Sequence, residues 1–338
     1  MTGALERTLA DALAHLLTAV DTCDDEVLDP DEAVRWMEHT AHVLDRLTAA
    51  DRRRLAELFH DTARREPEEG PWRDALRELP GTLGLDDDAH SAYCDAVADH
   101  TARFVAAVRD ADPATPVSTC PGWTLADLVR HLGEVCRWMD HLVSTRATAR
   151  VEPGAVPLDL PGDPAEHPAW LARSADAALR TLRAAHPDTP MWSYGADPHA
   201  RFYARRLCFE TAVHLADAEL ALGGEPRVQQ GTAADGIEEF LENLPYYAWV
   251  AEPIAQLGRD GAALRLRAAD TGAVWTLTLG DGGFGWSTSG TGPAGVTVEA
   301  GCGELLLLLY GRYGAGDSRF TVTGDRALLD AWLAATRF

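Results

Sequence analysis

The 338-residue chain contains no lysine, since all 30 of its basic residues are arginine. This excludes covalent catalysis through a lysine Schiff base. Long apolar runs are also lacking: none exceeds six residues, the length of Leu305 to Tyr310, whereas a membrane-spanning helix needs about 20. The N-terminal stretch mixes charged and apolar residues without a small-residue cleavage site, which predicts a helix rather than a signal peptide. We therefore expect a cytoplasmic protein with no membrane partner.

Paired cysteines are missing as well. The six cysteines are scattered along the chain and form no C-x-x-C motif, which excludes a small disulfide scaffold and a thiolate zinc ribbon. Basic residues are few, because 53 acidic residues leave a formal net charge of −23. Binding to a phosphate backbone needs concentrated positive charge, so we expect no nucleic-acid partner.

Residues 1–86 are predicted to be an acidic helical extension. Leucines recur at helical spacing near the N-terminus, and Asp29-Pro30 is typical of a helix start. Residues 1–88 hold 22 acidic and 10 basic residues, a net charge of −12. The acidic stretch 85–89 predicts a domain boundary. We assign this extension no chemistry and regard it as a candidate surface for a protein partner or for self-association.

Residues 89–228 are predicted to form a four-helix domain. The expected helices are 89–110, one that begins at the Thr124 cap and passes through His131, 168–185 and 198–222, the last ended by two glycines. A proline- and glycine-rich connection covers 152–168 and is long enough to cross the domain. Four helices with one long crossover indicate a bundle.

Residues 231–338 are predicted to form a small α+β domain. Segments 263–268 and 273–279 alternate apolar and polar residues with period two, as half-buried strands do. Further strands are expected near 286 and at 296–299 and 319–324, with helices at 231–244, 303–310 and 325–335. Strands and helices that do not alternate regularly favour an α+β fold.

Glu210 and His214 are the strongest candidates for chemistry. Their spacing of four residues places a carboxylate and an imidazole on one helix face. His131 lies on an apolar helix face and can supply a third donor. Two histidines, one carboxylate and an open fourth position are typical of catalytic zinc, and Asp217 is placed to orient an imidazole. The spacing alone leaves a plain hydrogen-bonded Glu–His pair as an alternative.

Three segments resemble one known family. Residues 117–133, VSTCPGWTLADLVRHLG, closely resemble the first signature of the mycothiol-dependent maleylpyruvate isomerase family. Its second signature is similar to MWSYG at 191–195 followed by RRLCFETAVHLAD at 205–217. The stretch ELLLLLYGR at 304–312, with TGD at 323–325, is similar to the C-terminal domain of that family. The resemblance spans residues 89–338.

This resemblance implies a DinB-like four-helix metal-binding bundle followed by a sterol-carrier-like α+β domain. The histidine of the first signature corresponds to His131, and the zinc ligands of the second correspond to Glu210 and His214. Mycothiol is implied as the thiol cofactor or co-substrate. Trp192 and Asp217 are the candidate cofactor contacts, Trp192 as core or pocket wall.

The implied chemistry is that of an activated thiol. Zinc holds a small thiol as the thiolate, which is the stronger nucleophile. It would attack an electrophilic small molecule, and Arg205, Arg206 and Arg312 are candidates to orient an acidic acceptor. Arg205 and Arg206 precede Glu210 by five and four residues. Either arginine is therefore equally well explained as a salt-bridge partner of Glu210.

Two features depart from the family. The extension has no counterpart there, and Leu215-Ala216 follow His214 where the family often has arginine and an aromatic residue. The sequence therefore leaves open a cis-trans isomerase and an S-transferase of detoxification or secondary metabolism, with the extension favouring the transferase slightly. The alternative from another class is a non-catalytic protein that binds a small molecule or a partner, with a structural metal or none.

Overall fold

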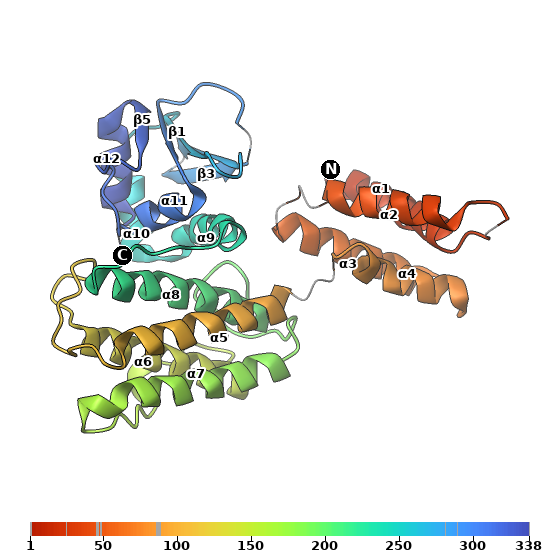
Figure 1. The fold of residues 1–338 in the computed structure, drawn as a ribbon. Coiled ribbons are helices and arrows are strands. Elements are labelled where there is room, and N and C mark those ends of the chain that lie inside the picture. The colour runs from red at the N-terminus through yellow and green to blue at the C-terminus, as the bar shows by residue number, and fades with distance from the viewer. Residues whose placement is uncertain are drawn as a thin grey trace. The chain divides into compact units, whose positions relative to one another are not determined.

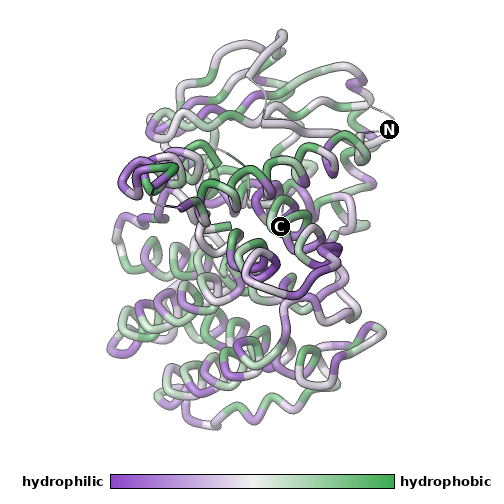
Figure 2. The backbone as a smooth tube through the Cα atoms, turned by 90° about the vertical axis from the view of Figure 1, so that its right-hand side faces the viewer, coloured by the Kyte–Doolittle hydropathy of each residue, from purple (hydrophilic) through white to green (hydrophobic). Residues whose placement is uncertain are grey.

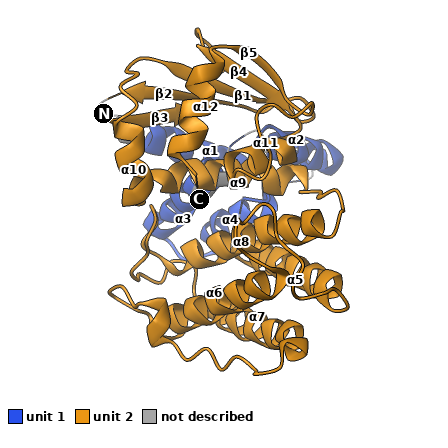
Figure 3. Ribbon diagram, turned by 90° about the vertical axis from the view of Figure 1, so that its left-hand side faces the viewer, with its two compact units in different colours: residues 1–89 blue, residues 90–338 orange. Residues whose placement is uncertain are grey.

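The computed structural model describes residues 2–24, 26–44, 47, 49–85, 89–280, 282–288 and 290–337. It divides into two compact units, residues 1–89 and 90–338, which are coloured separately in Figure 3. Residues 86–88 of the predicted boundary lie outside the described residues. None of the helices in the described part of the chain combines the length and apolar character that a bilayer crossing requires.

The first unit is helical. Its elements are α1 (Thr2–Asp21), α2 (Pro30–Leu44), α3 (Ala49–Arg65) and α4 (Pro71–Thr82). Small and large apolar residues from these helices form its own core, among them Ala14, Phe59 and Leu76. Asp29 caps α2, because its Oδ1 accepts from the backbone amide of Asp31 at 2.9 Å. The predicted helical extension is confirmed.

The second unit begins with the predicted bundle. Its helices are α5 (Ala89–Val108), α6 (Leu125–Thr145), α7 (His167–Ala184) and α8 (Ala200–Ala221), seen side by side in Figure 1. Thr124 and Asp127 form a reciprocal capping box that starts α6, and Arg146 ends it in the left-handed conformation. The connection from α6 to α7 contains two short 3-10 helices, η1 (Pro153–Ala155) and η2 (Pro164–Glu166).

Helices α6 and α7 pack very closely. The close approach depends on Gly133 of α6, where an added Cβ would lie 2.0 Å from Cζ3 of Trp170. Trp170 on α7 is 2% exposed, and its indole N–H donates to the carbonyl of Leu158 in the connecting loop at 3.1 Å. Helices α6 and α7 of the bundle are therefore held at a short, fixed distance from each other.

The rest of the second unit is the predicted α+β domain. Its elements are α9 (Gln230–Asn243), η3 (Leu244–Tyr246), α10 (Ala248–Ala255), β1 (Ala263–Ala268), β2 (Val274–Gly280), β3 (Gly283–Ser287), β4 (Val296–Ala300), α11 (Cys302–Leu309), β5 (Thr321–Gly324) and α12 (Arg326–Ala335). The strands form one sheet in the order β3-β2-β1-β4-β5. Strands β1 and β4 pair in parallel, and the other neighbours are antiparallel. The predicted fold class is confirmed, while α10 had not been predicted.

The bundle and the α+β domain share apolar contacts. Val213 of α8 is buried in the same cluster as Phe240 of α9 and Leu306 of α11, and Tyr194 packs against the cores of both halves. In Figure 2, green and purple alternate along the helical coils, as helices with one buried and one exposed side require. The junction of α8 with α9 and α11 is therefore well packed, and the candidate site lies there.

Candidate functional site

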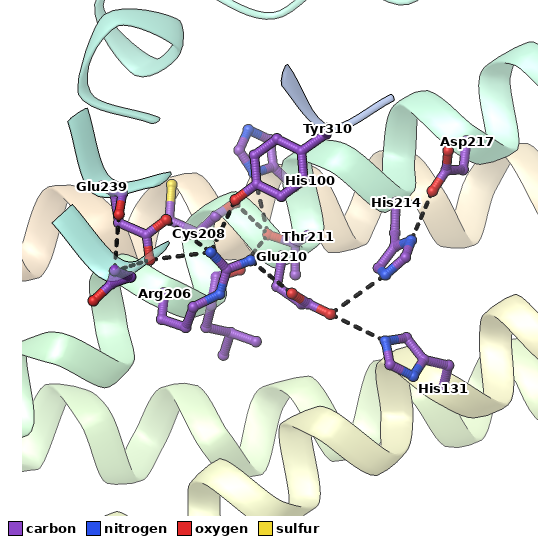
Figure 4. Close-up of polar contacts among 12 residues, drawn as sticks. His100, His131, Arg206, Cys208, Glu210, Thr211, His214, Asp217, Glu239 and Tyr310 are labelled. Atoms are coloured by element: carbon purple, nitrogen blue, oxygen red, sulfur yellow. Dashed lines mark hydrogen bonds and ion pairs between the residues drawn. The ribbon is translucent and has the colours of Figure 1, made fainter. Parts of the chain in front are cut away.

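Three side chains converge between α6 and α8. Oε1 of Glu210 lies 3.0 Å from Nε2 of His131 and 3.3 Å from Nε2 of His214 (Figure 4). One donor atom from each residue lies within 4.8 Å of the others. Helix α8 presents Glu210 and His214 one turn apart, while α6 brings His131 from the opposite side. The two helices thus aim two imidazole nitrogens and a carboxylate oxygen at a common point.

Asp217 orients the imidazole of His214. Its Oδ2 lies 2.7 Å from Nδ1 of His214, one turn along α8, and its side chain is fully buried. A hydrogen on Nδ1 satisfies this contact, which leaves Nε2 directed toward Glu210. Asp217 does not line the cavity described below, so the structure gives it a role in positioning His214 rather than in contacting a cofactor.

Arg312 and the loop before α6 complete the surroundings of Asp217. Nε and Nη2 of Arg312 donate to the two carboxylate oxygens at 2.9 and 2.7 Å, and the Thr119 hydroxyl donates at 2.6 Å. Cys120 Sγ is 3.4 Å from the same carboxylate. Although burial raises the pKa of Asp217, the contacts with His214 and Arg312 outweigh it and hold that pKa far below its usual range.

Arg206 holds the other side of Glu210. Its Nη2 donates to Oε2 of Glu210 at 2.6 Å, and its Nη1 lies 3.0 and 2.7 Å from the two oxygens of Glu239. The same Nη1 is 3.0 Å from the hydroxyl oxygen of Tyr310. Burial acts to raise the pKa of Glu210, but His131, His214 and Arg206 together hold it well below the usual range. Glu210 is therefore an anion at neutral pH.

The contact between His214 and Glu210 requires a positive charge. With Nδ1–H directed at Asp217, a neutral His214 would turn the lone pair of Nε2 toward a carboxylate oxygen 3.3 Å away. A proton on Nε2 removes this conflict: burial opposes the charged imidazole, but Asp217, Cys120 and Glu210 raise the pKa of His214 well above its ordinary value. A divalent cation bound to the same donors would remove it equally well, so the donor set fits a metal.

A cavity opens beside these donors. Its volume is about 420 Å³, and it is lined from both halves of the second unit. The bundle and its loops contribute Thr119, Cys120, Pro121, Trp123, His131, Tyr194, Arg206, Glu210, Val213 and His214, and the α+β domain contributes Glu239, Phe240, Asn243, Tyr247, Trp249, Tyr310 and Arg312. The donors thus lie at the wall of a space that can admit a small molecule.

Two family models match this chain. The model of the mycothiol maleylpyruvate isomerase N-terminal domain matches residues 94–219, and the model of the C-terminal domain of the same family matches residues 232–331. The chain belongs to this family. The matched ranges contain all three donor residues and the α+β domain, and neither includes the first unit.

Solved structures and curated sequences add little to this assignment. A crystal structure of the mycothiol-dependent maleylpyruvate isomerase is 14% identical over 69% of this chain and 92% of the other, with a TM-score of 0.45. A histidine-to-alanine mutant of that isomerase gives 14% identity over 70% and 92%, with a TM-score of 0.44. The comparison with curated protein sequences gave no match.

Some predicted site residues of this isomerase-family chain lie elsewhere. Arg205 does not line the cavity: it pairs with Asp235 at 2.6 Å and Glu242 at 2.5 Å, so its proposed contact with an acceptor must be corrected. Trp192 is half-buried, packs against Trp138 and Tyr194 and does not line the cavity, so a cofactor contact by Trp192 stays a prediction. Arg206 and Arg312 do line the cavity.

Other lining residues were not singled out from the sequence. They are Glu239 on α9, Tyr247 directly before α10, Trp249 on α10 and Tyr310 directly after α11. The sequence around these residues shows no spacing typical of a functional site. Tyr310 does lie in the stretch 304–312, which was noted as similar to the family's C-terminal domain. Cys120 also lines the cavity and forms a second possible donor group with His214 and Asp217.

Proposed function

We propose that this protein is a metal-dependent enzyme that uses mycothiol as a nucleophile against an electrophilic small molecule. The observation that carries the proposal is the convergence of His131, Glu210 and His214 at the wall of a cavity of about 420 Å³. Membership of the mycothiol maleylpyruvate isomerase family supports mycothiol as the thiol.

His131, Glu210 and His214 would hold the metal, for which zinc fits the two imidazoles and one carboxylate. A bound zinc ion would supply Lewis-acid stabilisation of a thiolate at neutral pH. The rest of the work falls to the protein. Asp217 fixes the tautomer and orientation of His214, and Arg206 keeps Glu210 ionised and directed at the two imidazoles.

The reaction common to the family-like alternatives is addition of the thiol to an activated double bond. The aromatic side chains that line the cavity would limit the access of water to the reacting sulfur, and the cavity would hold the acceptor beside the donors. Elimination of the thiol after bond rotation gives an isomerase, whereas release of the thioether gives an S-transferase. We propose thiol addition as the shared step, and the extension of residues 1–86 favours retention of the thioether.

The test is consumption of mycothiol by the full-length protein. Purified protein loaded with zinc is mixed with mycothiol and an α,β-unsaturated carbonyl compound, and free thiol and adducts are followed by mass spectrometry. The proposal expects protein-dependent thioether or isomerised product, lost in Glu210→Ala. No protein-dependent product from a panel of acceptors that includes maleylpyruvate would reject it.

A further inference from the structure

The cavity arginines are already neutralised by carboxylates of the protein. Arg206 contacts Glu210 and Glu239, and Arg312 makes a two-pronged contact with Asp217. The side chains of Arg206 and Arg312 are only 8% and 7% exposed. A guanidinium fixed in this way has little charge left to attract a second carboxylate from a substrate.

The third guanidinium nitrogen of Arg312, Nη1, also has a hydrogen-bond partner. Its Nη1 donates to the backbone carbonyl of Tyr310 at 2.8 Å, while Nη2 lies 3.7 Å from Cys120 Sγ. In Arg206, the nitrogen Nη1 that contacts Glu239 also lies 3.0 Å from the Tyr310 hydroxyl oxygen. Both guanidinium groups therefore act as parts of the wall that connects the bundle with the α+β domain.

Charge balance supports the same conclusion. The three carboxylates Glu210, Glu239 and Asp217 and the two arginines Arg206 and Arg312 sum to a charge of −1. Burial raises the pKa of Glu239, and the positive charge of Arg206 opposes that rise, because Nη1 of Arg206 lies 2.7 and 3.0 Å from the two carboxylate oxygens. A divalent cation and one thiolate add a charge of +1, which brings the cavity to zero before any acceptor enters.

The wall away from the donors is aromatic. Tyr247 and Trp249 stack with ring centroids 5.0 Å apart and planes inclined by 15°, and Tyr194 lies 6.2 Å from Tyr247. Phe240 packs against Tyr310 at 4.9 Å. Trp249 on α10 is 62% exposed, so it lies at the outer part of the lining. Such a wall binds flat, conjugated molecules through stacking and apolar burial.

From these observations, and resting on the proposed function, we infer that the acceptor is an uncharged, conjugated or aromatic enone rather than a carboxylate. The thiol sulfur forms a bond to the β-carbon, the π electrons move toward the carbonyl, and the α-carbon takes a proton. Thiol and enone together account for every atom of the thioether, so the step needs no further reactant. A dianionic acceptor would add two uncompensated charges to a balanced, buried space.

The test compares two acceptors that differ in one substituent, which is charged in one and neutral in the other. Benzylideneacetone and benzylidenepyruvate share a conjugated aromatic skeleton, and the second carries a carboxylate in place of a methyl group. With the zinc-loaded full chain and mycothiol, we expect kcat/KM for the neutral acceptor to be higher by at least about tenfold. Equal or faster reaction of the carboxylate would overturn the inference while leaving the proposed function in place.

A binding measurement separates this inference from catalysis. The saturated analogues benzylacetone and benzylpyruvate cannot accept a thiol, and their dissociation constants follow from quenching of tryptophan fluorescence, since Trp123 and Trp249 line the cavity. We expect the neutral analogue to bind at least about tenfold more tightly, with or without zinc. If the neutral analogue binds more tightly but no acceptor consumes thiol, the proposed function fails, while the inferred preference of the cavity for uncharged ligands holds.

Glu239 is the specificity-determining residue in this scheme. Glu239→Gln removes one negative charge next to Arg206, and we expect it to increase the affinity for benzylpyruvate by about tenfold. The matched control is Glu242→Gln on the same helix, because Glu242 pairs with Arg205 outside the cavity. An unchanged preference in a folded Glu239→Gln protein, or the same change in Glu242→Gln, would contradict the role given to Glu239.

Discussion

At the scale of single residues, the carboxylate of Glu210 is the centre of the site. One of its oxygens faces both imidazoles, and the other accepts from Arg206. An ordinary surface Glu–His pair would leave one oxygen in water, whereas here each oxygen has a defined partner. Removal of any one of these partners is therefore expected to reorient the Glu210 carboxylate, which the remaining partners also contact.

His131→Ala tests the third donor. We expect the variant to lose stoichiometric zinc, because a site left with one imidazole and one carboxylate binds zinc much more weakly. The measurement is the metal content of the purified protein together with zinc affinity from competition with a chelator. The matched control is His141→Ala on the same helix, which lies outside the donor group. Equal zinc content in the two variants would argue against His131 as a ligand.

The residues of the site differ in how far sequence alone could identify them. His131, Glu210 and His214 were identified because spacing and the family resemblance pointed to the same three residues. The spacing of four residues places Arg206 on the helix face of Glu210. The second acidic partner of Arg206 and the partners of Arg205 could not be predicted, because these carboxylates lie on α9. The aromatic wall depends on how α9 and α10 pack, which no local spacing encodes.

At the scale of elements, the contact of α6 with α7 fixes the helix that carries His131. We expect Gly133→Ala to destabilise the protein by about 1–3 kcal/mol, because its Cβ must displace a buried indole ring. Urea unfolding would measure the change. Gly154→Ala is the control, since a Cβ there meets no heavy atom within 4 Å. Similar unfolding free energies for both variants would contradict the close packing.

Helix α9 meets the sheet at a buried carboxyl. Glu238 is 7% exposed and lies 3.4 Å from the indole nitrogen of Trp275 on β2. Burial, aided by the negative charge of Asp235, raises its pKa from 4.5 to about 7, although the Trp275 N–H opposes the shift. The folded protein therefore keeps a proton on Glu238 that the unfolded chain releases at lower pH.

Glu238→Gln should change the dependence of stability on pH. In the wild type, this carboxyl makes stability fall as pH rises from 4.5 to about 7, and the loss persists above pH 7. We expect Glu238→Gln to be more stable than wild type at pH 8 by roughly 2 kcal/mol and to differ much less at pH 4.5. Thermal unfolding at several pH values would show this, with Glu252→Gln as control, because Glu252 on α10 is exposed. A constant difference across the range would contradict it.

The elements with clear periodicity were predicted, and those without it were not. The capping residues and apolar spacing located α5, α6, α7 and α8, and period-two alternation located β1 and β2. Helix α10 was missed because it is short, contains Pro253 and has Trp249 exposed, so its pattern is not that of an amphipathic helix. It forms because α12 and β3 pack against it, which is tertiary information.

At the scale of the whole molecule, the chain consists of two compact units with separate cores. The residues that line the cavity, and all three donors, belong to the second unit. The predicted division into residues 1–86, 89–228 and 231–338 stays a prediction, and the two matched family ranges fall within its second and third parts.

A fragment of residues 89–338 should fold and bind zinc without the first unit. We expect unchanged zinc stoichiometry and a single cooperative unfolding transition, because the fragment retains the bundle core and the shared core of the α+β domain. Circular dichroism and metal analysis would check this. An insoluble or metal-free fragment would show that the first unit supports the site.

The division of the cavity between the two halves has a consequence for how this family diversifies. His131, Glu210 and His214 lie on α6 and α8. The aromatic residues Phe240, Tyr247 and Trp249 come from α9, from the position directly before α10 and from α10. Substitutions of Phe240, Tyr247 and Trp249 can thus change the aromatic wall of the cavity while leaving the three donor residues and their charged partners in place. Selection can therefore act almost separately on the donor residues and on the aromatic wall. Recombination at the α8–α9 connection would combine the donor residues of one family member with the cavity wall of another.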